Sequence, residues 1–254
     1  MAGETYSAVE ARSQREVWPP DDTEESVVGT DLQQTTIINV RLGINETAAM
    51  RTPPGGVAPW QALSQTLITG FRRPDGTRYK TMPDVFVYPR PIGKRRGSVS
   101  LGADGPPLLI VEVLSESTYE TDLDMEAGKG YSYAKAGVAE YMTLDPTGEF
   151  LREGIRAWRL DGDLYRPWLP GADGRWRSGQ IAVALALEGA QATVYTLDGM
   201  RHLREGEIAQ ELAYRDAALA ERDATLAQRD AALADRNATL AELRSRLAQL
   251  GEPT

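Results

Sequence analysis

Pro107-Leu108-Leu109-Ile110-Val111-Glu112-Val113-Leu114-Ser115 is an apolar stretch interrupted by a single acid. Its β-branched residues, and the pair Pro106-Pro107 at its start, predict a short strand buried on both faces. A carboxylate in such a strand is costly unless another group compensates its charge. Glu112 therefore requires a partner from elsewhere in the chain.

A second acid begins a similar apolar run, Met82-Pro83-Asp84-Val85-Phe86-Val87-Tyr88. If the two runs form neighbouring strands, Asp84 and Glu112 converge and their like charges repel. A hard divalent cation with oxygen ligands is the simplest partner that keeps both acids ionised. Lys129, in a helical stretch downstream, is a candidate for a further positive charge. Its spacing alone fits an ordinary exposed helix lysine more simply.

Further short motifs continue this order along the chain. After Pro83-Asp84-Val85 come Ile110 to Ser115 with Ser117-Thr118, then Asp122-Leu123, Lys129 four residues before Tyr133, Ala136-Gly137-Val138, and Glu140-Tyr141 with Asp145-Pro146. In content and spacing this series resembles the Uma-type endonucleases of the PD-(D/E)XK nuclease superfamily. The resemblance extends over roughly residues 25 to 200 and is most specific between residues 83 and 146.

The resemblance implies an α/β (α+β) fold, restriction-endonuclease-like, with a mixed β-sheet core and flanking helices. The implied activity is endonucleolytic cleavage of nucleic acid with Mg²⁺ (or Mn²⁺) as cofactor. The implied catalytic residues are Asp84, Glu112 and Lys129, and the implied metal ligands are Asp84, Glu112 and the Val113 carbonyl. The superfamily usually has its lysine two residues after the second acid, where this chain has Leu114. Lys129 would therefore be a migrated lysine.

The composition limits the chemistry and the compartment. The chain has 254 residues, 41% of them hydrophobic, which is enough for one sizeable domain and an appendage. There is no cysteine and only one histidine, His202, so any metal is expected to be bound by oxygen. The sequence contains no apolar stretch of membrane-spanning length and no visible export signal, which predicts a cytoplasmic protein.

The formal net charge of -9 argues against a protein that coats nucleic acid by charge alone, but the local balance differs. Between Gly70 and Arg96 there are eight basic residues and two acidic ones. A phosphate backbone, most simply that of DNA, could dock on this stretch. The candidate contacts are Arg72, Arg73, Lys94, Arg95 and Arg96. A solvated hairpin and loop is an equally simple interpretation of these charges. The connection from Gly93 to Gly105 is long enough to predict a functional or mobile loop, and a substrate lid is the candidate role.

Three regions are predicted. Residues 1–30 are acidic and poor in apolar groups, which favours a flexible arm. Glu24 or Glu25 in this arm falls near the position of an additional active-site acid in the family, although an exposed charge is the simpler interpretation. Residues 31–204 are the nuclease-like domain, and residues 205–254 are a C-terminal heptad-repeat helix.

Several elements of the central domain can be placed from the sequence. For residues 31–50 the alternation of apolar and polar residues favours a strand, whereas the cap at Asp31 and the family resemblance favour a helix, which we expect. Residues 118–137 are expected to form one helix weakened by two glycines, with Tyr131 and Tyr133 as packing residues. Residues 155–168 predict a hairpin whose Trp158 and Trp168 cover a sheet face, and two further strands follow at residues 181–187 and 193–197. His202 is expected to be structural or exposed.

The last region differs in kind from the rest. Leucine recurs every seven residues from Leu212 to Leu247, and near-identical units surround it. This pattern predicts a long helix that pairs with its copy as a parallel coiled coil and makes the protein a homodimer. The helix positions facing the partner beside each leucine are Asp216, Asp223, Asp230 and Asn237, so the predicted seam is narrow and the pair weak. A solitary charged helix is the alternative.

Two functions from different classes are compatible with these features. One is a Mg²⁺-dependent endonuclease. The other is a catalytically inactive protein that keeps the nuclease fold and recruits partners through its coiled-coil tail. The leucine at position 114 and the acidic net charge support the second, and no phosphate-binding loop, dinucleotide fingerprint or nucleophile elbow supports a third class.

Overall fold

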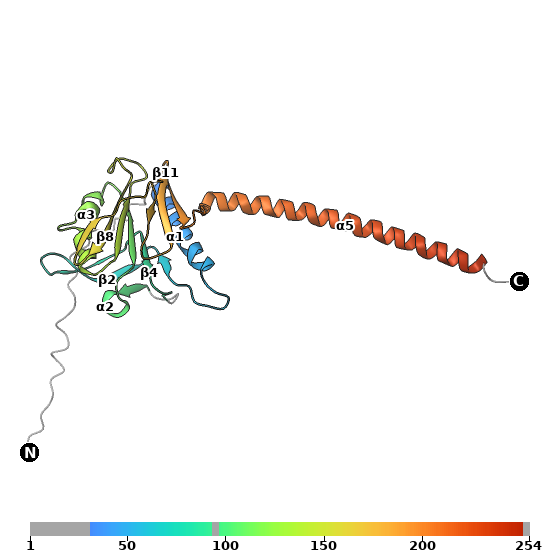
Figure 1. Cartoon of the computed structure of the whole chain (residues 1–254), viewed down its shortest axis with the longest axis horizontal. Coiled ribbons are helices and arrows are strands. Elements are labelled where there is room, and N and C mark those ends of the chain that lie inside the picture. Colours follow the sequence, from blue (N-terminus) through green and yellow to red (C-terminus); the bar gives the residue numbers. More distant parts are fainter. Residues whose placement is uncertain (1–30, 93–96, 251–254) are drawn as a thin grey trace, which may run out of the picture. The chain divides into compact units, whose positions relative to one another are not determined.

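A computed structural model describes residues 31–92 and 97–250 (Figure 1). The predicted roles of Glu24, Glu25, Lys94, Arg95 and Arg96 fall outside these residues. The chain divides into two compact units, one ending at Arg204 and the other starting at Glu205. None of the helices in the described part combines the length and hydrophobicity that crossing a bilayer requires.

A six-stranded mixed sheet forms the centre of the first unit, in the order β1-β4-β6-β7-β8-β9. β6 and β7 are parallel, and the other neighbouring strands are antiparallel. The strands are β1 (Gln61–Leu63), β4 (Val85–Tyr88), β6 (Leu109–Val113), β7 (Glu140–Leu144), β8 (Ile155–Asp161) and β9 (Leu164–Pro167). The two apolar runs that carry Asp84 and Glu112 are thus neighbouring strands. The predicted α+β architecture with a mixed sheet is confirmed.

Two small sheets flank the central one. The first has the order β3-β2-β5, and the second has the order β10-β11-β12. Their strands are β2 (Leu67–Arg72), β3 (Arg78–Thr81), β5 (Ser98–Ser100), β10 (Trp176–Arg177), β11 (Val183–Glu188) and β12 (Gln191–Thr196). The β2–β3 hairpin is therefore not part of the sheet that contains Asp84. The connection before Gly105 is also more regular than the predicted loop, because it contains β5 and the short helix α2 (Leu101–Asp104).

Helix α1 (Asp31–Met50) resolves the conflict over this region in favour of a helix. Its buried positions recur every three or four residues, as one face of a helix requires, and they are Thr36, Ile37, Asn39, Val40, Gly43, Ile44, Thr47 and Ala48. Gly43 allows a close approach to β12, because a Cβ atom there would lie 2.5 Å from the Val194 Cβ. The strand-like alternation in the sequence thus coexists with a helical face.

The predicted single helix over residues 118–137 is wrong. The chain forms α3 (Tyr119–Leu123) and α4 (Lys129–Lys135), separated by a turn. The Asp124 carboxylate accepts the backbone N–H groups of Glu126 and Ala127 at 2.8 and 2.9 Å, which stabilises the turn at the expense of a helix. Gly128 precedes α4 as its N-cap, so it does not weaken a helix interior.

Two apolar cores lie on the opposite faces of the central sheet. One includes Val111, Val113, much of α1 and the strands β11 and β12. The other includes Phe86, Ile110, Tyr133 and Tyr141, with β2 and β5. Trp158 belongs to the second core and Trp168 to the first, so the prediction that both cover one face is wrong. Trp158 pairs with Pro167, and the next residue along the strand points to the other side.

The end of the first unit is anchored by a buried histidine. His202 is 6% exposed, and its ring nitrogens lie 2.7 Å from Thr47 Oγ1 and 2.8 Å from Glu46 Oε2. It joins the segment after β12 to α1. Of the two predicted roles, the structural one is confirmed and the exposed one is wrong.

Candidate active site

The pairing of β4 with β6 brings the two predicted acids together. Val85 is opposite Val111 in this antiparallel pair, so the same register sets Asp84 opposite Glu112. Side chains alternate between faces along a strand, and Phe86 and Ile110 both belong to the core on one face. Asp84 and Glu112 are therefore expected to point to that same face, and their hydrogen bonds agree.

Each acid is bound to the backbone of the other's strand. The Asp84 N–H donates to Glu112 Oε2 at 3.2 Å, and the Val113 N–H donates to Asp84 Oδ2 at 2.7 Å. Asp84 Oδ1 accepts no hydrogen bond from the residues that the structure describes. One carboxylate oxygen of Asp84 therefore stays available to an added ligand.

Glu112 is buried and has two further partners on α4. Its Oε1 accepts a hydrogen bond from the Tyr133 hydroxyl at 2.6 Å and one from Lys129 Nζ at 3.2 Å. Lys129 and Tyr133 are four residues apart, so they lie on the same face of the helix. The structure thus brings Asp84, Glu112 and Lys129 into one cluster, as the resemblance predicts.

A third acid completes the cluster. Asp122, on α3, lies with its Oδ1 2.8 Å from Lys129 Nζ, and its side chain is only 2% exposed. Its backbone carbonyl accepts the Tyr141 hydroxyl at 2.7 Å, which fixes α3 to the central sheet. Lys129 therefore bridges two buried carboxylates from different elements.

The glycines on either side of Lys129 allow this arrangement. A Cβ atom at Gly128 would lie 2.4 Å from the Thr121 carbonyl oxygen, and one at Gly130 would lie 2.4 Å from the Met125 side chain. Real Cβ atoms do not approach other atoms so closely. The Thr121 oxygen belongs to the backbone of α3, so the start of α4 can approach α3 only because Gly128 lacks a side chain. The contact at Gly130 is with the end of the flexible Met125 side chain, which can move aside.

The electrostatics of the cluster are those of buried acids in excess. Burial raises the pKa of Asp84 and of Glu112 above their usual range, with Lys129 opposing the shift in both. Burial alone would lower the pKa of Lys129, but the charges of Glu112 and Asp122 outweigh it and raise that pKa above its usual value. Three acids thus face one ammonium, so an additional positive charge in the cluster would be electrostatically favourable.

The cluster suits a cation held by oxygen, although its protein ligands are few. Within residues 31–92 and 97–250, no three His, Cys, Asp or Glu side chains are grouped as a metal site. The candidate ligands are two carboxylates, with Oδ1 of Asp84 free of hydrogen bonds, and the backbone at Val113. Mg²⁺ commonly keeps several waters and takes one or two protein carboxylates, so this donor set fits it.

Three residues in or beside the cluster were not predicted as site residues from the sequence. Asp122 stood within a motif, and Tyr133 was predicted to pack, which it does while also binding Glu112. Gln33, on α1, donates a hydrogen bond from its side-chain amide to the Leu114 carbonyl at 2.8 Å. The four-residue spacing of Lys129 and Tyr133 was the available signal, whereas nothing local marks Gln33.

The basic residues that the structure describes lie on a hairpin next to the cluster. Arg72 and Arg73 are exposed at the end of β2, and Arg73 lies over the Tyr79 ring at 5.5 Å. The Phe71 ring lies 5.1 Å from the Tyr133 ring, so the hairpin packs directly on α4. The exposure and position of Arg72 and Arg73 are compatible both with binding of a phosphate backbone and with a solvated hairpin.

Two other acids of the motif series have structural partners. Glu140 accepts hydrogen bonds from Arg159, Ser178 and the Gly179 N–H, which anchors the segment before β11 to the central sheet. Asp145 accepts backbone N–H groups from Thr147, Gly148, Phe150 and Leu151 and holds the turn after β7. Neither side chain contacts Glu112 or Lys129.

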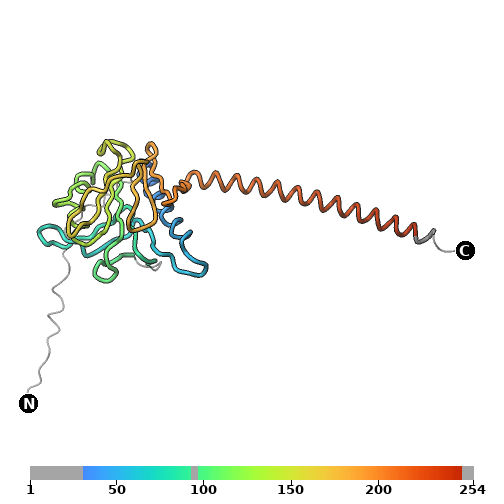
Figure 2. The backbone as a smooth tube through the Cα atoms, in the orientation of Figure 1, coloured from blue at the N-terminus to red at the C-terminus, as the bar shows by residue number. Residues whose placement is uncertain are grey.

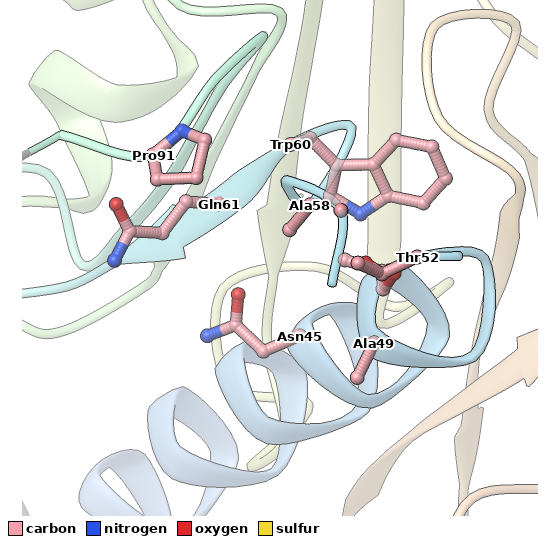
Figure 3. Close-up of a pocket in the computed structure, with 9 residues that line it drawn as sticks. Asn45, Ala49, Thr52, Ala58, Trp60, Gln61 and Pro91 are labelled. Atoms are coloured by element: carbon pink, nitrogen blue, oxygen red, sulfur yellow. The ribbon is translucent and has the colours of Figure 1, made fainter. Parts of the chain in front are cut away.

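A pocket of about 490 Å³ lies elsewhere, between α1 and β1 (Figure 3). Asn45 and Gln61 line it, but the Asn45 side chain pairs with the Ala62 backbone, and Gln61 accepts the Ile92 N–H. The lining contains no titratable residue and none of the predicted site residues. The pocket therefore shares no residue with the acid cluster.

The comparison with known families agrees with the motif series. Residues 57–167 match the family model Uma2, described as "Putative restriction endonuclease". This range includes Asp84, Glu112, Asp122, Lys129 and Tyr133, but not Gln33. No curated protein matches the chain. The match over residues 57–167 agrees with the resemblance to the Uma-type family that the motifs between Pro83 and Pro146 carry.

Proposed function

We propose that the protein is a Mg²⁺-dependent (or Mn²⁺-dependent) endonuclease that hydrolyses phosphodiester bonds, most simply in DNA. The observation that carries the proposal is the convergence of Asp84, Glu112 and Lys129 on one face of the central sheet. The match of residues 57–167 to the family model described as "Putative restriction endonuclease" supports the reaction class, hydrolysis of phosphodiester bonds.

The residues of the cluster have separate roles in this proposal. Asp84, through Oδ1, Glu112 and the Val113 carbonyl would hold the ion. When bound, such an ion polarises the phosphate and lowers the pKa of a bound water. Tyr133 fixes Glu112 by its hydroxyl hydrogen bond, and Gln33 fixes the backbone just beyond Val113 by binding the Leu114 carbonyl.

Lys129 acts as a cation rather than as a base. Its raised pKa keeps the ammonium charged near neutral pH, so it has no lone pair with which to accept a proton. A charged donor beside the reacting phosphate orients the attacking water and stabilises the negative charge that develops. Asp122 is a positioning residue in this scheme, because its carboxylate is a second ion-pair partner of Nζ beside Glu112.

Substrate binding is assigned to the basic stretch beside the cluster. Arg72 and Arg73 would contact the phosphate backbone, and Lys94, Arg95 and Arg96, outside the described residues, would extend the contact. These contacts would be to phosphates, so they would carry little sequence information and would weaken with salt.

A second candidate is an inactive protein that retains the fold and acts as a scaffold. One observation favours it: both Glu112 and Asp122 already have Lys129 as an ion-pair partner without an added cation. In this case the cluster would only stabilise the domain, and its acids would bind no ion. Metal binding and cleavage separate the two candidates.

The test uses the full chain with duplex DNA, single-stranded DNA and RNA, each with Mg²⁺, Mn²⁺ or a chelator. The proposal expects cleavage that requires the ion and is lost in Asp84→Asn and Glu112→Gln. Glu116→Gln removes a nearby exposed acid outside the cluster and serves as the control. Calorimetric titration with Mn²⁺ should show binding to the wild type and not to either cluster variant. A folded wild type without metal binding or cleavage favours the scaffold.

A further inference from the structure

The second unit is one long helix with an exposed row of leucines. α5 (Glu205–Leu250) is unbroken along its length (Figure 2). Leu212, Leu219, Leu226, Leu233, Leu240 and Leu247 are between 44% and 69% exposed. They recur at every seventh residue, so they form one ridge. A row of large apolar side chains in water is unfavourable without a partner.

The charges beside this leucine ridge are sorted by sign. Leu219, Leu226 and Leu233 each have an arginine four residues before and three residues after. Each also has an aspartate three residues before, and an aspartate or Asn237 four residues after. Neighbours at i−4 and i+3 lie on one flank of a helical ridge, and those at i−3 and i+4 lie on the other. The ridge therefore has a basic flank and an acidic flank.

Apart from Arg215, these charges have no ion-pair partner within the described helix. Arg215 pairs with Glu211 and Arg246 pairs with Glu242, both at the i,i+4 spacing. Between Asp216 and Ala241, however, no charged side chain of the described α5 has an ion-pair partner, and the sequence offers none three or four residues away. A solitary charged helix is normally stabilised by many such pairs. The central heptads lack this feature.

Symmetry decides which second helix fits. In a parallel pair related by a twofold axis along the helices, the acidic flank of one copy faces the basic flank of the other on both sides of the ridge. In an antiparallel pair, each flank faces its own kind and the charges repel. We propose that α5 is a homodimerisation surface that pairs in parallel and in register, leucine to leucine, with Arg222, Arg229 and Arg236 bound by the partner's acidic flank.

The proposed interface joins an apolar centre to charged edges. The leucines supply the apolar contact, and the arginine stems cover them at the sides while their charged heads reach the partner. A copy of the same chain thus supplies both the apolar and the charged complement.

The first experiment measures association of the full chain by sedimentation. The wild type should be dimeric and should dissociate as salt is raised, because the flank pairs are exposed. Arg222→Glu/Arg229→Glu/Arg236→Glu makes both flanks acidic and should weaken the dimer about tenfold or more. Asp216→Lys/Asp223→Lys/Asp230→Lys makes both basic and should weaken it similarly. An equimolar mixture of the two variants should restore the dimer.

A matched control tests whether the leucine ridge is the face of α5 that pairs. Asp235→Lys makes the same chemical change as Asp230→Lys but away from the leucine ridge. Only Asp230→Lys should weaken the dimer. Equal effects of the two would contradict the assigned surface, as would a wild type that stays monomeric at about 100 µM, a concentration at which even weak pairs form.

The second experiment tests whether the two helices run parallel or antiparallel. Because the chain has no native cysteine, only the introduced cysteines can form disulfides. Leu219→Cys and Leu240→Cys should each form a disulfide with their own kind under mild oxidation. In a parallel in-register pair, positions 219 and 240 are about 31 Å apart, so a mixture should not form the mixed disulfide. An antiparallel dimer gives the mixed product instead and overturns the proposal.

Discussion

Lys129 Nζ lies 2.8 Å from Asp122 Oδ1, closer than the 3.2 Å that separates it from Glu112 Oε1. The lysine therefore has two ion-pair partners, which lie on different elements, α3 and β6. Because both carboxylates are buried, the position of the ammonium depends on their joint geometry rather than on the lysine rotamer alone. The first prediction follows from this arrangement.

Asp122→Asn should lower the turnover of the nuclease about 10- to 100-fold, since the ammonium loses one of its two fixed partners and its alignment with the substrate. Mn²⁺ affinity and KM should change little, because Asp122 is not among the proposed ligands. Asp122→Glu, which keeps the carboxylate, should recover part of the turnover. A loss of metal binding equal to that in Glu112→Gln would make Asp122 a ligand instead.

Lys129→Met should separate chemistry from metal binding. Removing an ammonium from a cluster of acids should make Mn²⁺ bind as tightly or more tightly, because a cation no longer competes for Glu112. The single-turnover rate should fall about 100-fold or more, since the charged donor to the phosphate is lost. Weaker metal binding with an unchanged rate would contradict the role proposed for Lys129.

Stability of the metal-free protein should depend on pH through Glu112 and Asp84. Their pKa values are raised by burial, so the folded state binds protons more tightly than the unfolded chain. This contribution is fully present below the unfolded pKa, about 4, and is lost as pH rises through the raised folded pKa. The Tm without metal should therefore fall as pH rises over this window.

A divalent ion should reverse that trend, because it binds the ionised acids. The gain in Tm with saturating Mn²⁺ should be small at acidic pH and should increase with pH. Differential scanning fluorimetry of the wild type beside Glu112→Gln measures it. The variant should lose the part of the pH-dependent fall that comes from Glu112, together with the metal-dependent gain. An identical pH profile in the two proteins would exclude Glu112 as a source.

Much of this cluster could be predicted, and the reason lies in the strands. The apolar runs around Asp84 and Glu112 are unambiguous, and two acids that enter adjacent core strands must converge if the register allows it. What the sequence lacks is that register, together with contacts between distant segments. Gln33 reaches Leu114 over 81 positions of sequence, and Asp122 reaches Lys129 through a turn that the helical pattern concealed.

The errors have physical causes of the same kind. The expected helix over residues 118–137 ignored the competing hydrogen bonds of the Asp124 carboxylate to its own backbone. Trp158 and Trp168 were assigned to one face because both are large and apolar, although hairpin register sends them to opposite faces. For residues 31–50, in contrast, the cap and the family resemblance outweighed a misleading alternation, and the helix is confirmed.

Asp145 should be a stability residue rather than a catalytic one. Its carboxylate accepts four backbone N–H groups and the Thr147 hydroxyl. Burial would raise its pKa, but these hydrogen bonds outweigh it and lower the pKa below its usual value. Asp145→Ala should destabilise the domain by about 2–3 kcal/mol, measured by urea unfolding at neutral pH, because several donors lose their acceptor. Metal affinity of the folded fraction should be unchanged, and a loss of affinity without destabilisation would contradict the structural role.

The last prediction concerns the close approach that positions Lys129. Gly128→Ala introduces a Cβ atom 2.4 Å from the Thr121 carbonyl oxygen and 2.7 Å from the Asp124 Cβ, so α4 must move away from α3. The move should destabilise the domain by about 1–3 kcal/mol and lower nuclease turnover, since Lys129 begins α4 and moves with it. Gly102→Ala is the control: it makes the same glycine-to-alanine change within the short helix α2, where the nearest atom to a new Cβ is 3.9 Å away. That substitution should be neutral or stabilising, because alanine loses less backbone freedom on folding than glycine. Urea unfolding and single-turnover cleavage of both variants measure the contrast. Equal behaviour of the two would mean that the contact between α3 and α4 does not determine where the ammonium lies.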